Sequence, residues 1–170
     1  MKINRSSAVL ALVLAAAAIP AHAVQADIKV WADIDTTLAL MRADGSALPD
    51  VVQMSHNPAS GLVPWSDQVR IFSNDTTRDV AVRLGNPAEL MPMIAAPGAT
   101  AVPLTISLND VALSTAEQDF TARELFDGAL PGASIAMPLR IAQTTQERIG
   151  AAGLYEGIVT IVMAQKAGSP

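Results

Sequence analysis

Few side chains in this sequence have the types and spacing that catalysis needs. His56 lies close to Ser66 and Asp67 in the chain, but no nucleophile motif surrounds this serine. The acidic residues between positions 117 and 124 could supply a pair of carboxylates, yet their pattern is typical of the polar side of a surface turn. The absence of cysteine excludes thiol nucleophiles, thiolate metal sites and disulfides. The sequence therefore predicts no enzyme and no cofactor.

Two features could bind a ligand, and each has a simpler explanation. Asp27, Asp33 and Asp35 carry the oxygen atoms that calcium prefers, but their alternation along a strand without a glycine turn is typical of a solvated face. Trp65 follows Pro64 and could stack on a sugar. The alternative is that this side chain packs onto its own domain or between two subunits. We predict no metal site, and Trp65 is the best local indication of receptor binding.

The first 23 residues have the three parts of a secretory signal peptide. A positively charged start precedes an uncharged apolar run over residues 8–19, and the small residues Ala21 and Ala23 stand where signal peptidase needs them. The apolar run is shorter than the roughly 20 residues of a membrane-spanning helix. We therefore predict cleavage before Val24 and export of the mature chain.

The charge of the mature chain limits its partners. Residues 1–23 contain two of the 11 basic residues and none of the 16 acidic ones, so the mature net charge is 9 − 16 = −7. Nucleic acids and anionic membranes attract clustered Lys and Arg, and no such cluster occurs in this sequence. We exclude nucleic acid as a partner and expect the negative charge to keep free copies apart.

The start of the mature chain has the alternation of a long β-strand. Over residues 24–41 the even-numbered positions are apolar except Thr36, and the odd-numbered positions up to Thr37 are mostly polar. The apolar side of its first part consists of Val24, Ala26, Ile28, Val30, Ala32 and Ile34. No hairpin partner precedes this strand in the mature chain. It therefore pairs either within its own domain or with a neighbouring copy.

Short apolar segments alternate with turn residues along the rest of the chain. Asn109-Asp110 predicts a two-residue hairpin loop, and residues 115–126 could hold a helical turn. Pro138 indicates that its strand lies at an edge or has an interrupted ladder. Strands are predicted at 51–55, 68–73, 80–84, 102–108, 111–113, 135–141 and 157–164. This spacing is typical of a single all-β sandwich domain.

Several of these segments, taken in order, resemble one family. They are VQADIKV (24–30), ADGSALP (43–49), SNDTT (73–77), VAVRL (80–84), VPL (102–104), LST (113–115), MPL (137–139), IAQTT (141–145) and GIV (157–159). The chain resembles the major pilins of the alternate chaperone–usher fimbriae, the cable-pilin and colonization-factor group. The resemblance covers essentially the whole mature chain.

This resemblance implies an incomplete immunoglobulin-like β-sandwich that is completed by donor-strand exchange. Its parts would be a signal peptide (1–23), an N-terminal donor strand (24–36) and a pilin domain (37–170). The last predicted strand ends near Ala164, and only a short polar tail follows it. The acceptor groove is expected beside Val159, Ile161 and Met163, where a neighbour's donor strand would supply the missing strand.

The resemblance also implies a function and a set of partners. The chain would be the structural major subunit of a surface fimbria, exported through the periplasm, which supports adhesion. Its partners would be further copies of itself, a periplasmic chaperone, an outer-membrane usher, a tip adhesin subunit and possible host receptors. The alternative is a minor or tip subunit that binds a host receptor directly, although the mature chain leaves no room for a second domain. A secreted enzyme or periplasmic carrier is supported by no group of residues.

Overall fold

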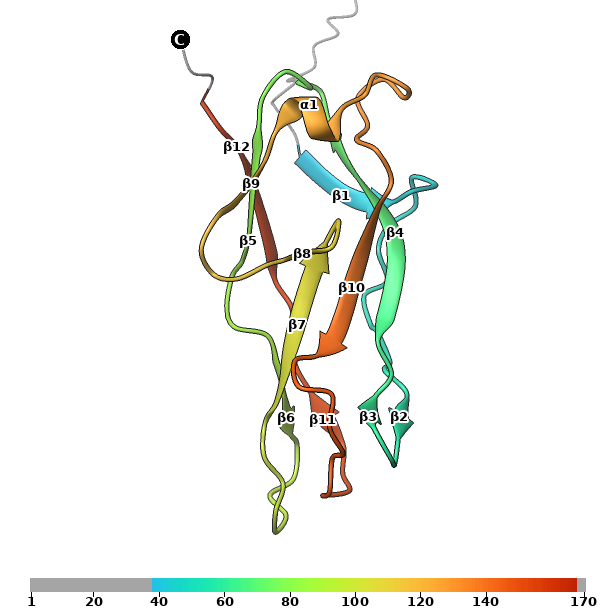
Figure 1. Ribbon diagram of the computed structural model, residues 1–170, viewed down its shortest axis with the longest axis vertical. Coiled ribbons are helices and arrows are strands. Elements are labelled where there is room, and N and C mark those ends of the chain that lie inside the picture. The colour runs from blue at the N-terminus through green and yellow to red at the C-terminus, as the bar shows by residue number, and fades with distance from the viewer. Residues whose placement is uncertain (1–37, 168–170) are drawn as a thin grey trace, which may run out of the picture. The chain divides into compact units, whose positions relative to one another are not determined.

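The computed structural model describes residues 38–167 (Figure 1). The predictions for the signal peptide, for cleavage between Ala23 and Val24, and for the donor strand lie outside the described residues. Within residues 38–167, no helix is long and apolar enough to cross a membrane.

Most of the described strands belong to one antiparallel sheet. Its order is β1-β4-β10-β7-β6-β11, and β8 also pairs with β7. The strands are β1 (Leu38–Arg42), β4 (Trp65–Ser73), β6 (Glu89–Pro92), β7 (Val102–Leu108), β8 (Val111–Ala112), β10 (Met137–Gln143) and β11 (Tyr155–Glu156). This sheet forms one layer of the domain.

A smaller sheet and two local elements complete the described structure. The smaller sheet has the order β12-β5-β9, from β12 (Ile161–Gln165), β5 (Val80–Leu84) and β9 (Gln118–Phe120). A hairpin joins β2 (His56–Asn57) to β3 (Gly61–Leu62). The single turn of helix α1 (Ala122–Leu125) begins at Thr121, whose side chain forms a capping box with Glu124. The predicted helical turn within residues 115–126 is therefore confirmed.

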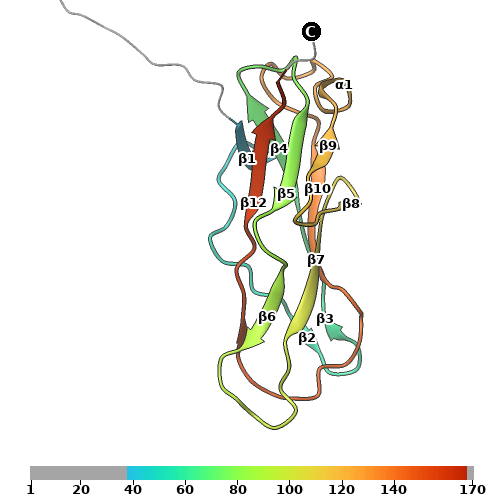
Figure 2. The ribbon, with the colours of Figure 1, turned by 90° about the vertical axis from the view of Figure 1, so that its left-hand side faces the viewer.

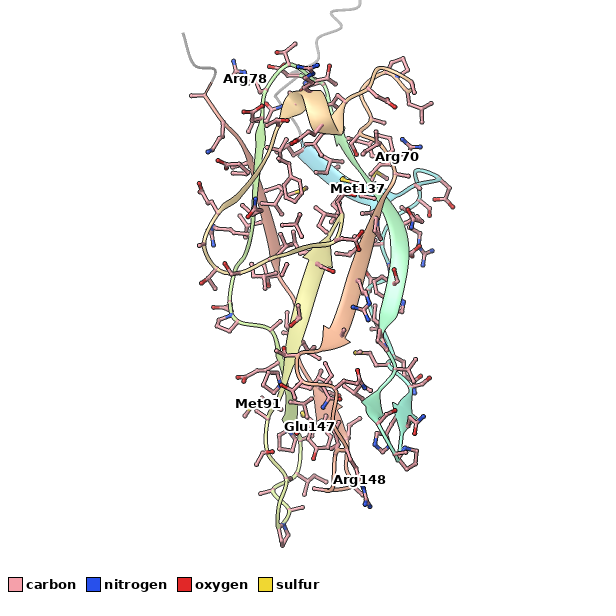
Figure 3. The ribbon with its side chains drawn as sticks, in the orientation of Figure 1. Arg70, Arg78, Met91, Met137, Glu147 and Arg148 are labelled. Atoms are coloured by element: carbon pink, nitrogen blue, oxygen red, sulfur yellow. The ribbon has the colours of Figure 1, made fainter. Side chains whose placement is uncertain are left out.

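The hydrophobic core lies between the two sheets. Val69 and Ile71 of β4, Val82 of β5 and Ile106 of β7 are each 0% exposed. They belong to one cluster because alternate side chains of a strand point to the same face. Figure 2 shows β12 beside β5, and Figure 3 shows the side chains that fill the space between the layers, including the buried Met137.

The hairpin that the sequence predicts at Asn109-Asp110 is present. These two residues join β7 to β8, and both have positive φ angles, of 50° and 62°. Two consecutive left-handed residues match the right-handed twist of the flanking strands, and Asn and Asp tolerate this conformation better than most residues.

Of the two alternatives that the sequence predicts for Pro138, the edge strand is wrong and the interrupted ladder agrees with the structure. The strand of Pro138, β10, lies inside the large sheet and pairs with β4 on one side and β7 on the other. The ladder to β7 extends only to Leu139, and the carbonyl of Pro138 accepts a hydrogen bond from the N–H of Asn109. The missing N–H of Pro138 thus falls where β7 turns away into its hairpin. The proline costs no ladder hydrogen bond there.

One predicted strand is absent, and several others have different bounds from those predicted. Residues 51–55 form no strand, and the last strand begins at Ile161 rather than at position 157. Residues 157–160 form no strand, and they follow β11, which pairs with β6 at the end of the large sheet. Neither β6 nor β11 was predicted, because each is too short for its alternation to be visible.

Candidate subunit interface

The last strand of the domain has one free edge. β12 pairs with β5 through five residue pairs, and no other strand of residues 38–167 pairs with it. The carbonyl of Thr160 accepts from the N–H of Gly85, and the N–H of Lys166 donates to the carbonyl of Asp79. Even-numbered residues of β12 therefore direct their backbone groups toward β5. Those of Ile161, Met163 and Gln165 point to the opposite edge, because successive residues alternate.

β1 presents a second free edge next to this one. β1 pairs only with β4 among the described strands, and it contacts β12. The N–H of Ala43 donates to the carbonyl of Gln68 on the β4 side. By the same alternation, the backbone groups of Leu38 and Leu40 point away from β4. The edges of β1 and β12, one from each sheet, thus lie on the same side of the sandwich.

Apolar side chains line these two edges. Leu38 and Leu40 come from β1, and Val159, Ile161 and Met163 come from β12 and the segment before it; all five are partly buried and pack against the core. We call these five residues and the two free edges the β1–β12 seam. Another apolar strand laid along it would bury side chains that are now only half-covered. It would also pair backbone groups that no described strand pairs.

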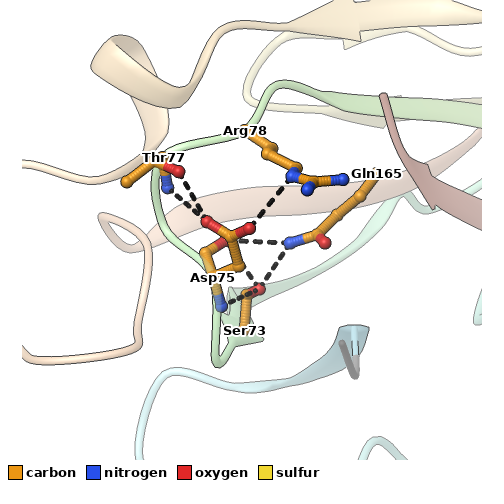
Figure 4. Close-up of polar contacts among 5 residues, drawn as sticks. All are labelled: Ser73, Asp75, Thr77, Arg78 and Gln165. Carbon is orange, nitrogen blue, oxygen red and sulfur yellow. Dashed lines mark hydrogen bonds and ion pairs between the residues drawn. The ribbon is translucent and has the colours of Figure 1, made fainter. Parts of the chain in front are cut away.

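A polar network ties one end of the seam together (Figure 4). The side-chain amide of Gln165 donates to the hydroxyl of Ser73 and to the backbone carbonyl of Asp75, each at 2.8 Å. Its Oε1 atom is buried and has no hydrogen-bond partner. The Asp75 carboxylate accepts from the Thr77 hydroxyl at 2.7 Å and lies 3.0 Å from Nε of Arg78. The Thr77 hydrogen bonds, more than Arg78, lower the pKa of Asp75.

We expect the substitution Gln165→Ala to lower the free energy of unfolding by about 1–3 kcal/mol, because it removes two hydrogen bonds of about 0.5–1.5 kcal/mol each. Urea unfolding of the mature chain would measure the change. Gln118→Ala is the matched control, since Gln118 is exposed and its amide makes one long bond of 3.3 Å to the carbonyl of Asp119. Equal losses in the two variants would show that Gln165 does not hold β12 to the β4–β5 turn.

Four of the residues considered for catalysis or ligand binding have structural partners. The Asp67 carboxylate pairs with Nε of Arg42 at 2.8 Å. Asp119 forms an ion pair with Lys166, which raises the pKa of this lysine, and Glu124 belongs to the α1 capping box. Trp65 is partly buried and packs against the core, as the packing interpretation expects. Among residues 38–167, no group of three His, Cys, Asp or Glu could hold a metal ion.

The structure brings the predicted acceptor residues Val159, Ile161 and Met163 together on one edge, whereas the six donor residues lie outside the described part. Sequence reasoning missed the contribution of Leu38 and Leu40 to the seam. A signal for both was present, since they continue the even-numbered apolar alternation. Gln165 was also missed, and no sequence signal points to it, because its partners lie about 90 positions earlier in the chain.

Comparisons with known proteins agree on the kind of molecule. The family model of CS1 type fimbrial major subunits matches residues 24–164. A CFA/I fimbrial subunit of Escherichia coli O78:H11 (strain H10407 / ETEC) is 31% identical over 168 residues, which cover 96% of this chain and 98% of that protein. A CS1 fimbrial subunit of Escherichia coli is 28% identical over 171 residues, which cover 97% of this chain and 99% of that protein.

A solved structure has the same fold. The CooA pilin subunit from enterotoxigenic Escherichia coli superimposes with a TM-score of 0.67 at 21% identity, over 79% of this chain and 90% of that one. The molecule is thus an all-β, immunoglobulin-like pilin sandwich that lacks one strand, as predicted. The chain belongs to the family of CS1 type fimbrial major subunits. It is a structural major subunit of a cell-surface fimbria and polymerises with other subunits.

Proposed function

We propose that the mature chain polymerises by laying its N-terminal strand along the β1–β12 seam of a neighbouring copy. The donor segment is 24–36, and its apolar side chains pack against Val159, Ile161 and Met163. Those donor side chains are Val24, Ala26, Ile28, Val30, Ala32 and Ile34. Strand addition of this kind takes its affinity from main-chain hydrogen bonds and its register from alternate side chains.

The free edge of β12 is the observation that supports this mechanism. Its outward N–H and C=O groups belong to Ile161 and Met163, whose apolar side chains are only partly buried. An exposed apolar edge is a site at which another chain adds a strand. A segment with one apolar and one polar side fits it, because a single register buries its whole apolar side.

An antiparallel orientation fits the seam best. Antiparallel pairs are somewhat more stable per residue than parallel ones. β12 runs from Ile161 toward Gln165, so an antiparallel donor would enter at the Gln165 end, with Ile28 opposite Gln165 and Val30 opposite Met163. Its Ile34 would then lie near Val159. The donor strand ends a few residues before its own β1, and the two copies are therefore joined close to this point.

The assembly partners follow from this mechanism. The signal peptide 1–23 directs the chain to the periplasm, and cleavage after Ala23 frees Val24 as the start of the donor strand. A periplasmic chaperone covers the seam until an outer-membrane usher exchanges it for the donor strand of the next copy. A tip adhesin subunit would stand at the end of the fibre, and the shaft would support adhesion through its many copies.

Disulfide trapping tests both the site and the orientation, because the natural chain contains no cysteine. We expect the double variant Ile34→Cys with Val159→Cys to give covalent multimers in fibres analysed on non-reducing gels. A disulfide forms only when the two Cα atoms come within about 7 Å. In an antiparallel donor strand these two positions are close, and the bond joins different copies.

The double variant Ala26→Cys with Val159→Cys is the matched control. In the antiparallel orientation Ala26 lies toward the Gln165 end, so we expect monomers on the same gel. The reverse result would show that the donor strand inserts parallel to β12. If neither pair formed multimers in intact fibres, insertion along this edge would be rejected.

A further inference from the structure

A second apolar surface lies beyond the seam, on the outward side of the β6–β11 pair. Met91 and Met93 are 50% and 54% exposed, and Leu154 and Ile158 are 62% and 86% exposed. We call these four residues the β6–β11 face. Figure 3 places Met91 near one end of the domain and Arg78 near the other.

The strand register explains why these side chains share one side. Met91 is opposite Glu156 and Pro92 is opposite Tyr155, and the N–H of Met93 donates to the carbonyl of Leu154. Opposite residues of an antiparallel pair lie on the same face, so Met91, Met93 and Leu154 point the same way. The other side of the pair carries Leu90 and Tyr155, which pack against the core. The exposed Glu89 and Glu156 share this outward side, so it combines large apolar side chains with two carboxylates and has no core to cover it.

Such a surface is unusual for a free domain. Single exposed apolar residues are common, but contiguous apolar patches on soluble proteins mark sites of interaction. Within residues 38–167, these four side chains are among the few large apolar ones that are mainly exposed. We therefore expect another molecule to cover these side chains.

The length of the connecting chain points to a second copy of this protein. This step rests on the proposed function. In the proposed mechanism, Ile34 of one copy lies near Val159 of its neighbour. Ile158 directly precedes Val159, so Ile34 also lies close to Ile158 of that neighbour. Leu38 of the donor copy follows four residues after Ile34, which allows a separation of at most about 14 Å. The donor domain therefore begins beside the β6–β11 face of the acceptor.

The surface of the donor copy at this point is also partly apolar. Leu38 is opposite Ser73 on β4, and the N–H of Ser73 donates to the carbonyl of Gly132 at 2.8 Å. The loop before Gly132 carries Leu130, which is 46% exposed. Figure 1 shows this loop near α1, at the end of the domain opposite β6 and β11. The two apolar surfaces lie at opposite ends, as a head-to-tail contact between identical copies requires.

We propose that the β6–β11 face of each subunit packs against the Leu130 loop of the subunit whose donor strand it holds. This contact is separate from the donor strand. It fixes the angle between successive domains, which the few residues between Ile34 and Leu38 alone would leave free. Fibre stiffness then depends on the β6–β11 face, whereas the joining of subunits depends on the seam.

The test is the double variant Met93→Lys with Leu154→Lys, made in the chain that also carries Ile34→Cys and Val159→Cys. Both lysines replace exposed side chains, so we expect normal folding. We expect the covalent multimers to form as before and the fibres to lose straightness, measured as a shorter persistence length in electron micrographs. Leu130→Lys should have the same effect. Thr115→Lys, an exposed residue between β8 and β9, is the control and should leave fibres straight.

The two readouts separate this proposal from the one on which it rests. Multimers with unchanged straightness would overturn the β6–β11 contact and leave donor-strand exchange intact. Straight fibres in reduced number would mean that the chaperone or the usher binds the β6–β11 face. This result would also overturn the contact between that face and the Leu130 loop. Absence of multimers in the parent Cys variant would overturn both proposals.

Discussion

Moving the donor strand to the other end of the chain should convert the subunit into a stable monomer. The variant lacks residues 24–35 at its N-terminus and carries a copy of them after a flexible linker at Pro170. We expect it to melt on the order of 10 °C above the same deletion without the fused copy. Thermal unfolding followed by circular dichroism would measure the difference, and size-exclusion chromatography would show whether the fused protein is a monomer.

The expected gain has several physical causes. Each of Ile28, Val30 and Ile34 contributes about 1.5–3 kcal/mol when it is buried, and the free backbone groups of β12 gain partners. The entropy of ordering the strand opposes these terms. The covalent link reduces the cost of association, because it holds the strand at an effective concentration on the order of millimolar.

The length of the linker adds a test of orientation. β12 ends at Gln165, so an antiparallel strand can begin near the point where the chain leaves the domain. A linker of a few residues is then sufficient. A parallel strand would have to begin near Val159, and its linker would have to span about 20 Å.

A fused copy that carries Val30→Asp is the matched control, and we expect little stabilisation from it. Equal melting temperatures for the fused and unfused chains would mean that the sandwich is already complete. Donor-strand exchange would then lack its physical basis.

The features that could be predicted from the sequence are those that depend on neighbouring residues. The Asn109-Asp110 turn needs only two residues that tolerate positive φ. The α1 turn needs only Thr121 and Glu124 at the spacing of a capping box. The alternation in β7 reports its buried face directly, since Val102, Leu104, Ile106 and Leu108 are all buried.

The features that could not be predicted depend on residues far apart in the chain. Pro138 is tolerated inside the sheet because β7 turns away beside it, which the sequence around the proline does not indicate. β11 exists because it pairs with β6 across more than 60 residues, and β6 itself pairs with both β7 and β11. The position of Gln165 at the end of the seam depends on Ser73 and Asp75. Alternation could therefore predict which side chains of the last strand share one side, but not the polar group at its end.

The substitution Val30→Asp should abolish fibre assembly. In the proposed register Val30 lies in the middle of the donor strand, with its side chain against the apolar residues of the seam. The variant loses about 1.5–3 kcal/mol of apolar burial. It would also place a carboxylate among apolar side chains without a partner, which costs several kcal/mol more. We expect no fibres in negative-stain electron micrographs of cells that make this variant with its chaperone and usher.

The soluble subunit distinguishes a block in polymerisation from a failure to fold. The residues that form the core and the seam are unchanged in Val30→Asp, so the subunit should accumulate as a soluble complex with its chaperone. Lys29→Asp is the matched control: it changes the charge by more than Val30→Asp does, but on the polar side of the same strand. We expect fibres from Lys29→Asp, because a strand buries only one of its sides in the neighbouring copy. Normal fibres from Val30→Asp would show that the even-numbered side of the strand does not join the subunits.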